Sequence, residues 1–492
     1  MTSAPADILL VAVNARYSHC AHAARSLLAN LGTLSGAGGL LEADLDTTPL
    51  QLAEQVVARR PRIAGFSVYL WNVRLVEATA QILRQVAPQL RLVAGGPELT
   101  PEYPRAALFD AVVIGEGETA FRNLCAEWLG AAATGTARGR VLRAEPEDPA
   151  ALALPDGLYA DADLAQRTVY VEASRGCPYG CAYCTSAGTG LRLLPLERLL
   201  PAFDRLWQRG LRRFKFLDRS FNAPAGHAAA VLDFFLGRAT PDMRLHFEIN
   251  PDHLHEVVAA RLASFPKNTL HLEVGIQTLN PGVARAIGRS PDTGAALGNL
   301  AFLTRQTGAA VHADLIFGLP GEDEASFARG FNALLAACRP PELQVNLLKG
   351  LPGTRLARDA AALGLTFNPE PPYELLRSDA LGFEALMRLQ RFARCWELVH
   401  NRRRFPHASG ALQAARPADP FGTYQALAER IAAEEGRLFA IGLPRLGRIL
   451  RDHLVGACGL ASREAEALLA ADLSAKPGGH DLTPASHVQT PL

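Results

Sequence analysis

Three cysteines within eight residues are the strongest chemical feature of the sequence. Cys177, Cys181 and Cys184 lie in the segment SRGCPYGCAYCTSAG, with the spacing Cys-x3-Cys-x2-Cys. A structural zinc ion normally takes four protein ligands, and no fourth cysteine or histidine lies close by in the sequence. Three thiolates instead suit a [4Fe–4S] cluster that keeps one iron without a protein ligand, which a small molecule can then bind. The spacing therefore favours an iron–sulfur cluster over structural zinc or three unrelated thiols.

Composition and charge narrow the class of protein. The other five cysteines are scattered singly among apolar residues, as buried thiols are in a reducing compartment, so we expect a cytoplasmic protein. The 492 residues include 50 Lys+Arg and 49 Asp+Glu, a net charge of +1. This balance gives no overall attraction to nucleic acid or to an anionic membrane. No signal peptide or membrane-spanning apolar run is recognisable, so neither nucleic acid nor a membrane is an expected partner.

The cysteines follow the first strand of a predicted series of alternating strands and helices. Six apolar, strand-like segments separated by helical stretches predict a partial (βα)6 barrel of the TIM type. They are residues 169–174, 212–218, 244–250, 269–276, 309–317 and 342–349. In such a barrel the active site lies at the carboxyl ends of the strands, which is where the cysteines fall.

A second αβ series precedes the barrel. Five strand-like runs, at 8–14, 40–45, 62–71, 91–97 and 111–117, alternate with helical stretches. They predict a doubly wound, flavodoxin-like parallel sheet with a ligand crevice at the carboxyl ends of its strands. Polar and glycine-rich residues stand at those ends: Asn14, the segment 67–72 with Tyr69 and Trp71, Gly95, Gly96, Gly115 and Glu116.

These patterns divide the chain into an α/β sheet domain (1–135), a linker rich in proline, glycine and acids (136–167) and the barrel (168–365). Residues 366–474 have helical periodicity and form a mostly α-helical domain, for which we hypothesise a role in capping the barrel and shaping a substrate pocket. Residues 475–492 lack periodicity and are expected to be a disordered tail.

The cysteine motif resembles the radical SAM signature Cys-x3-Cys-x-aromatic-Cys, with Tyr183 in the aromatic position. The resemblance implies that the open iron binds the amino and carboxylate groups of S-adenosylmethionine (SAM), whose reductive cleavage gives a 5′-deoxyadenosyl radical. It also places Asp218 at the methionine amino group, Glu248 at the ribose or carboxylate, and Gln277 near the adenosyl group or substrate. A helix N-cap for Asp218 and a salt-bridged acid for Glu248 are the structural alternatives.

A doubly wound domain in front of such a barrel resembles the cobalamin-binding subclass of this family. Cobalamin would lie in the crevice of the first domain, contacting Asn14, Tyr69, Trp71, Gly95, Gly96, Gly115 and Glu116. The sequence lacks the Asp-x-His-x-x-Gly motif whose histidine ligates cobalt, so residues near Tyr69 and Trp71 would fill the lower face of the corrin. Ordinary packing is the alternative for Trp71.

The order of the three regions is similar to a bacterial family of cobalamin-domain radical SAM proteins with a C-terminal domain of unknown role. The resemblance implies methylation of an unactivated carbon in a small-molecule or otherwise unknown substrate, with an electron donor such as flavodoxin or ferredoxin. Three alternatives stay open: a cyclase or rearrangement enzyme, a tRNA methylthiotransferase, and an iron–sulfur redox sensor without turnover. Against the methylthiotransferase, the first domain offers only Cys20 and Cys125 where that family carries three more cysteines.

Overall fold

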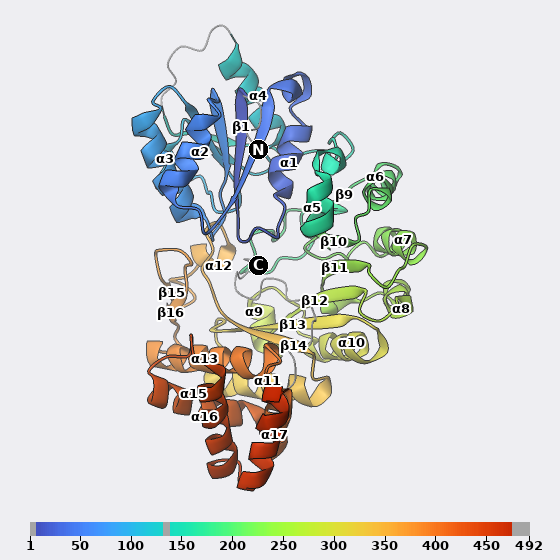
Figure 1. Cartoon of the computed structure of the whole chain (residues 1–492), viewed down its shortest axis with the longest axis vertical. Helices are drawn as coiled ribbons and strands as arrows, with labels where there is room; N and C mark the ends of the chain where they lie inside the picture. Colours follow the sequence, from blue (N-terminus) through green and yellow to red (C-terminus); the bar gives the residue numbers. More distant parts are fainter. Residues whose placement is uncertain (1–5, 131–137, 475–492) are drawn as a thin grey trace.

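The computed structural model describes residues 6–130 and 138–474. Figure 1 shows the N-terminal sheet domain (blue) above the second sheet (green to yellow), with the C-terminal helices (orange to red) packed below. Among the described residues, no helix has both the length and the apolar character that a membrane span requires.

The first domain is a parallel sheet of six strands in the order β2-β1-β3-β4-β5-β6. The strands are β1 (Ile8–Asn14), β2 (Gly38–Asp44), β3 (Ile63–Ser67), β4 (Arg91–Gly95), β5 (Ala111–Ile114) and β6 (Arg140–Arg143). The five predicted strands are all present, and the predicted flavodoxin-like order is confirmed. β6 is a sixth strand within the segment interpreted as a linker. The strand order reverses between β1 and β3, and ligands of doubly wound sheets bind at such a switch point.

Helices cover both faces of this sheet. They are α1 (His22–Ala29), α2 (Pro49–Ala58), α3 (Val73–Val86) and α4 (Glu118–Leu129). Alternate residues of β1 enter different cores: Leu9 and Val11 pack with α2 and α3, whereas Ile8 and Leu10 pack with α1 and α4. This burial on both faces explains why β1 reads as one continuous apolar run.

The second sheet has six parallel strands in the order β14-β13-β12-β11-β10-β7. They are β7 (Val169–Val171), β10 (Arg213–Phe216), β11 (Arg244–Ile249), β12 (Leu270–Gln277), β13 (Ala310–Phe317) and β14 (Glu342–Leu347). Each predicted strand is found, and β7 and β14 do not pair with each other, so the predicted partial barrel is confirmed. The helices outside it are α6 (Leu196–Gln208), α7 (Ala225–Leu236), α8 (Glu256–Ser264), α9 (Pro281–Ala286), α10 (Thr293–Gln306) and α11 (Glu324–Ala337).

Beyond β14 the chain is mostly helical, as predicted. Its helices are α12 (Arg355–Arg358), α13 (Phe383–Trp396), α14 (Pro406–Ala415), α15 (Pro420–Glu435), α16 (Leu443–Gly456) and α17 (Ser462–Ser474), with a short hairpin of β15 (Thr366–Phe367) and β16 (Leu375–Arg377). A π-helical turn, Glu397–Asn401, continues α13. These helices share one apolar core with the barrel, where Phe331 of α11 packs edge-on against Phe392 and Trp396 of α13. The predicted disordered tail lies outside the described residues.

A largely buried cluster of charges joins the first domain to the barrel. Arg175 lies in β8 (Ser174–Arg175), directly after β7, and its guanidinium is 3.2 Å from Glu116, 2.7 Å from Glu118 and 2.7 Å from Glu172. Glu116 and Glu118 belong to the first domain and Glu172 to the barrel. Burial would raise the pKa of Glu172, but the hydrogen bond with His22 and the charge of Arg175 hold it down to about 2.

Replacing Arg175 with Met should destabilise the protein by about 3 kcal/mol or more, because three carboxylates would then face one another without their shared cation. Urea unfolding at pH 7 measures this loss. Arg205→Met is the control: its pair with Asp156 is largely exposed on the arginine side, so its loss should cost less than about 1 kcal/mol. Equal losses in the two variants would contradict a special role for Arg175.

The difference in stability between the wild-type protein and Arg175→Met should also depend on pH. A carboxyl whose pKa is lower in the folded state stabilises the fold above its ordinary pKa of 4.5, and this stabilisation disappears as the pH falls toward about 2. The wild-type protein should therefore lose its advantage over Arg175→Met as the pH falls below about 4.5. Unfolding free energies measured between pH 7 and pH 3 check this, and a difference that widens in acid would contradict it.

Candidate functional site

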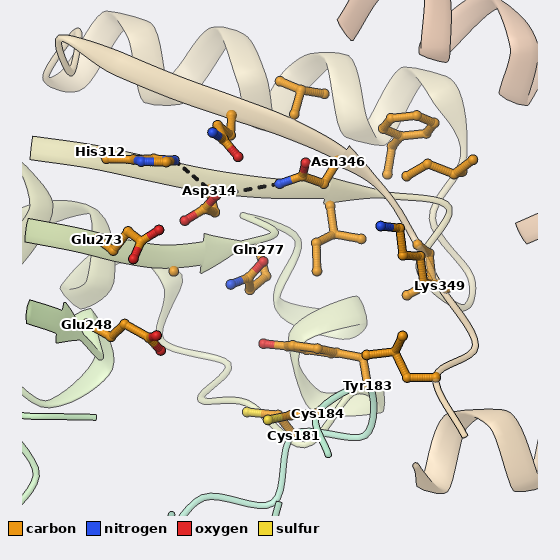
Figure 2. A pocket seen from close by; sticks show the side chains of 18 of the residues that line it. Cys181, Tyr183, Cys184, Glu248, Glu273, Gln277, His312, Asp314, Asn346 and Lys349 are labelled. Atoms are coloured by element: carbon orange, nitrogen blue, oxygen red, sulfur yellow. Dashed lines mark hydrogen bonds and ion pairs between the residues drawn. The ribbon is translucent and has the colours of Figure 1, made fainter. Parts of the chain in front are cut away.

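The three cysteines line one cavity of about 450 Å³ at the carboxyl ends of the second sheet. Figure 2 shows Cys181 and Cys184 on one side of this space and polar side chains from β11, β12 and β13 on the other. Cys177 is 7% exposed, and burial raises the pKa of the Cys181 and Cys184 thiols. The structure thus brings the three predicted cysteines together.

The arrangement fits a cluster better than a single ion. Within the described residues, no three His, Cys, Asp or Glu side chains are placed to hold one metal ion. The cysteines of a [4Fe–4S] cluster each bind a different iron, so they need to surround a shared volume and not a point. The cavity that all three cysteines line provides such a volume.

A tight turn positions the cysteine loop. The loop leaves β8 and returns in β9 (Arg192–Leu193), and these two short strands pair antiparallel. Gly176, just before Cys177, has φ +82°, and a Cβ there would lie 1.8 Å from the carbonyl oxygen of Gly190. The turn therefore requires glycine at position 176.

Asp218 holds the segment that precedes this loop. Its carboxylate accepts hydrogen bonds from the backbone N–H of Ala173 at 2.9 Å and from the hydroxyl of Ser174 at 2.5 Å. It is 2% exposed, does not line the cavity, and burial raises its pKa to about 7. These hydrogen bonds hold the segment that leads into the cysteine loop, and a contact of Asp218 with the methionine amino group stays a prediction.

Glu248 and Gln277 do line the cavity, as their predicted roles require. Arg219 lies 3.5 Å from Glu248, whose pKa burial raises to about 7. Gln277 follows a register shift in β12 and has φ +68°. Its side-chain Oε1 is buried and has no hydrogen-bond partner, so a donor on a bound molecule would satisfy it.

Tyr183 is buried beside the cysteines and also lines the cavity. The guanidinium of Arg289 donates to its hydroxyl at 3.5 Å and pairs with Asp252 at 2.9 Å. Burial raises the pKa of the Tyr183 hydroxyl, so it stays protonated and can donate a hydrogen bond into the cavity. Arg289 was not among the predicted site residues.

Four further barrel residues of the site were missed: Lys215, Glu273, His312 and Asp314. Each occupies an alternate, inward-facing position of a strand otherwise buried against helices. Glu273 accepts a hydrogen bond of 2.6 Å from His246 and is 3.9 Å from Lys215. The signal was available as polar residues at every second position, in HLEVGIQ (271–277) and HAD (312–314). These strands were interpreted only as apolar runs.

In the first domain, Tyr69 and Trp71 follow β3 at the switch point. Their rings stack with centroids 4.4 Å apart, and both side chains are half-buried. The indole N–H of Trp71 donates to the carbonyl of Val13 at 3.2 Å, and burial raises the pKa of the Tyr69 hydroxyl, which the charge of Arg219 partly offsets. The stacked pair therefore lies at the carboxyl edge of the first sheet and faces the barrel.

The other predicted cofactor residues of this domain have structural partners. Asn14 donates to the carbonyl of His19 and to Glu42, while Glu116 pairs with Arg175 and Arg192 across the domain junction. A Cβ at Gly96 would lie 2.3 Å from the carbonyl oxygen of Val68. Gly95, at the end of β4, and Gly115, with φ +97°, also stand at the carboxyl edge. A contact of these residues with cobalamin stays a prediction.

The C-terminal region supplies one wall of the cavity, in line with the hypothesis that it shapes a pocket. Gln390, Ala393, Arg394, Glu397 and Asn401, along one face of α13 and its π turn, line the cavity beside β14. A π turn inside a helix is often found at a functional site. Helix α13 thus forms the wall of the cavity next to β14, where a closed barrel would have another strand.

Three family models match the chain in succession. They are the B12 binding domain (residues 34–125), the radical SAM superfamily (171–332) and a protein of unknown function, DUF4080 (361–454). The chain therefore carries a B12 binding domain followed by a radical SAM domain. The cysteines and the four barrel strands β10 to β13 fall within the radical SAM match, and α13 falls within DUF4080.

Two curated relatives are methyltransferases. A 2-(S-pantetheinyl)-carbapenam-3-carboxylate methyltransferase of Streptantibioticus cattleyicolor is 27% identical over 321 residues, covering 58% of this chain and 46% of the relative. The cobalamin-dependent radical SAM methyltransferase TokK of Streptomyces tokunonensis is 26% identical over 343 residues, covering 62% and 49%. The chain thus matches about half the length of these relatives.

A solved structure shares the whole architecture. The cobalamin-dependent SAM radical enzyme OxsB, with aqua-cobalamin and SAM bound, superposes with a TM-score of 0.62 over 96% of this chain and 81% of its own. Sequence identity is 13%, so the likeness establishes the fold.

Gly176→Ala should destabilise the protein by about 2 kcal/mol or more, because it combines a left-handed backbone with a clash against the Gly190 carbonyl. Gly180→Ala, in the same loop, is the matched control: its Cβ would meet no atom within 4 Å, so its effect should stay within about 1 kcal/mol. Urea unfolding of both variants measures the difference. A Gly176→Ala protein as stable as Gly180→Ala would contradict the turn described here.

Proposed function

We propose that the protein is a cobalamin-dependent radical SAM enzyme that methylates an unactivated carbon of a small-molecule substrate. The observation that carries this proposal is that Cys177, Cys181 and Cys184 line one cavity whose far side is polar and made by the barrel strands. When bound, a [4Fe–4S] cluster supplies the electron that cleaves SAM, and cobalamin supplies the methyl group.

Each group of residues has a defined task in this proposal. The three thiolates hold the cluster and leave one iron for SAM. Glu248 and the unpartnered Gln277 Oε1 offer acceptors to the hydroxyl and amino groups of SAM, and the Tyr183 hydroxyl offers a donor. Asp218 acts indirectly, because it holds residues 173 and 174 in place before the cysteine loop.

The first domain would hold cobalamin over the barrel. Support comes from the match to the B12 binding domain and from the stacked, half-buried Tyr69 and Trp71 at the switch point. These rings offer a flat apolar surface of the kind that a corrin face can cover. No histidine is proposed as a cobalt ligand, because the sequence lacks the Asp-x-His-x-x-Gly motif. A small electron-transfer protein such as flavodoxin or ferredoxin would reduce the cluster.

The first experiment is to count the cofactors. Protein expressed with added hydroxocobalamin and purified without oxygen should contain about one corrin and four irons per chain. Four irons without corrin would overturn the cobalamin proposal and leave a radical SAM enzyme whose first domain has another task. Product analysis with a substrate then separates methylation from ring formation.

Cys181→Ala should abolish formation of 5′-deoxyadenosine from SAM, because the cluster would lose one of its three protein ligands. Cys458→Ala is the matched control, since Cys458 is also a partly buried free cysteine but lies in the C-terminal helices. The control should retain wild-type cleavage, measured by chromatography after addition of dithionite. Cleavage at the wild-type rate by Cys181→Ala would overturn the cluster assignment.

A further inference from the structure

The basic side chains that line the cavity have acidic neighbours, with one exception. The neighbours are Glu273 for Lys215, Glu248 for Arg219, Asp252 for Arg289, Asp314 for His312 and Glu374 for Lys349. Arg394 of α13 is the exception. Its side chain is half-buried and lines the same cavity, but it forms no ion pair with any residue that the structure describes.

The acid that acts on Arg394 is already bound to other groups. Glu397 lies one turn further along α13, and its Oε1 accepts from Arg402 at 3.3 Å while its Oε2 accepts from the side-chain amide of Asn401 at 3.0 Å. Burial and the charge of Arg402 lower the pKa of Arg394, and the charge of Glu397 offsets only part of this effect. An anion bound beside Arg394 would supply the compensating charge.

The guanidinium of Arg394 is held in one orientation. Its Nε donates to the carbonyl oxygen of Leu438, in the connection between α15 and α16, at 2.9 Å. Trp396, two residues further on, donates to the carbonyl of Leu343, which fixes this part of α13 against β14. The two terminal amino groups of the guanidinium donate to no group in the described part of the chain. A guanidinium that is oriented through Nε and keeps its terminal N–H groups free can bind a carboxylate through parallel hydrogen bonds.

Gln390 adds a second donor to the same wall. It lies one turn before Arg394 on α13, and it also lines the cavity. Side chains four residues apart are neighbours on the surface of a helix. The amide of Gln390 forms no hydrogen bond with the described residues, so its N–H groups are available to an anion that Arg394 holds.

This wall is separate from the part of the cavity that the proposed function assigns to the cluster and SAM. The cysteine loop and strands β10 to β13 lie within the match to the radical SAM superfamily, whereas Gln390 and Arg394 lie within the DUF4080 match. Radical SAM proteins share the chemistry of the cluster and SAM but act on different substrates. The additional region is therefore the part of the cavity wall from which contacts with the substrate are expected.

Apolar side chains line the same cavity, among them Ile316 of β13 and Val345 and Leu347 of β14. They can contact a hydrocarbon group that carries the C–H bond to be methylated. We propose that Arg394 and Gln390 bind the carboxylate of a small substrate whose remaining part is apolar. This inference rests on the proposed function, since it names the class of molecule that is methylated.

The probe is n-hexanoate, with n-hexanol as its uncharged counterpart. Each is added without reductant to the full-length protein that carries its cluster and saturating SAM, so that SAM occupies the open iron to which a carboxylate can otherwise bind. Saturation-transfer-difference NMR, which detects weak ligands, measures both Kd values. Hexanoate should bind at least tenfold more tightly than hexanol, because only the carboxylate accepts charge-assisted hydrogen bonds. Equal Kd values would overturn the proposal.

Arg394→Met should raise the Kd of n-hexanoate at least tenfold and leave the Kd of n-hexanol within about twofold of the wild-type value. Arg391→Met is the matched control. Arg391 lies three residues earlier on α13, pairs with Glu429 at 3.4 Å and does not line the cavity, so its loss should change the Kd of n-hexanoate by less than about twofold. An unchanged Kd in Arg394→Met, or equal effects of the two variants, would overturn the proposal.

A second variant covers the case in which Arg394→Met does not fold. Gln390→Glu keeps the size of the side chain and leaves the hydrogen bond of Arg394 to Leu438 in place. The new carboxylate would lie one turn from Arg394 and compete with the ligand, so the Kd of n-hexanoate should rise at least fivefold. No rise would contradict a carboxylate site at this wall.

SAM and cobalamin also carry anionic groups, a carboxylate and a phosphate, so their binding identifies the source of the anion. Arg394→Met should leave the Kd of SAM and that of hydroxocobalamin within about threefold of the wild-type values. A tenfold rise in either would assign Arg394 to that cofactor and overturn the proposal. The hexanoate titration uses neither cobalamin nor cleavage of SAM. A protein that binds hexanoate through Arg394 but contains no corrin would therefore refute the proposed function and leave the carboxylate site intact.

Discussion

The guanidinium of Arg175 fixes how the B12-binding domain meets the cysteine loop. It lies two residues before Cys177 and contacts Glu116 and Glu118 of the first domain as well as Glu172 at the end of β7. Because Glu116 stands at the carboxyl edge of the first sheet, one largely buried cation joins the edges of both sheets. Movement of one edge would leave several carboxylates buried without a partner, which is strongly unfavourable. The distance between the two proposed cofactor regions is therefore held by this ion cluster and not only by the chain that connects the domains.

Paired charges also organise the barrel interior, where the charged side chains are more closely spaced than at the domain junction. Inward-facing positions that are filled by branched apolar side chains in closed barrels carry Lys215, Glu248, Glu273, His312 and Asp314 here. Each acid is partnered through one oxygen by a base on its own strand, on a neighbouring strand or in an adjoining loop, so the network supports itself without filling the space. The result is a hollow, charged interior that opens toward the cysteines. Such an interior can orient a polar substrate, whereas an apolar barrel core would exclude it.

Most strands could be predicted from the sequence, whereas the contacts between side chains could not. The strands of both sheets are buried on two faces, so β1 and β13 appear as long apolar runs that few other elements produce. β6 escaped prediction because it has only four residues, RVLR, and is exposed at the edge of its sheet. The cysteines were found because their spacing alone specifies the chemistry. Asp218 shows what position alone leaves out: it follows the end of β10 as expected, and the hydrogen bonds that its carboxylate accepts from Ala173 and Ser174 are not visible in any linear pattern.

The DUF4080 region covers the edge strand that an open barrel leaves without a neighbouring strand. β14 is an edge strand, and an edge presents backbone N–H and C=O groups that would otherwise pair with another strand. Asn401 covers this edge: its amide accepts from the N–H of Leu343 at 3.1 Å and donates to the carbonyl of the same residue at 3.0 Å. The indole of Trp396 donates to that carbonyl as well, at 2.8 Å.

The side-chain amide of Asn401 thus forms with Leu343 the hydrogen bonds that a neighbouring strand would form. The helix that carries it also presents Gln390 and Arg394 to the cavity. Protection of the edge and formation of the pocket wall therefore depend on the same helix. It follows that changes on the cavity face of α13 can alter what the pocket accepts, provided that Trp396 and Asn401 keep the edge of β14 covered.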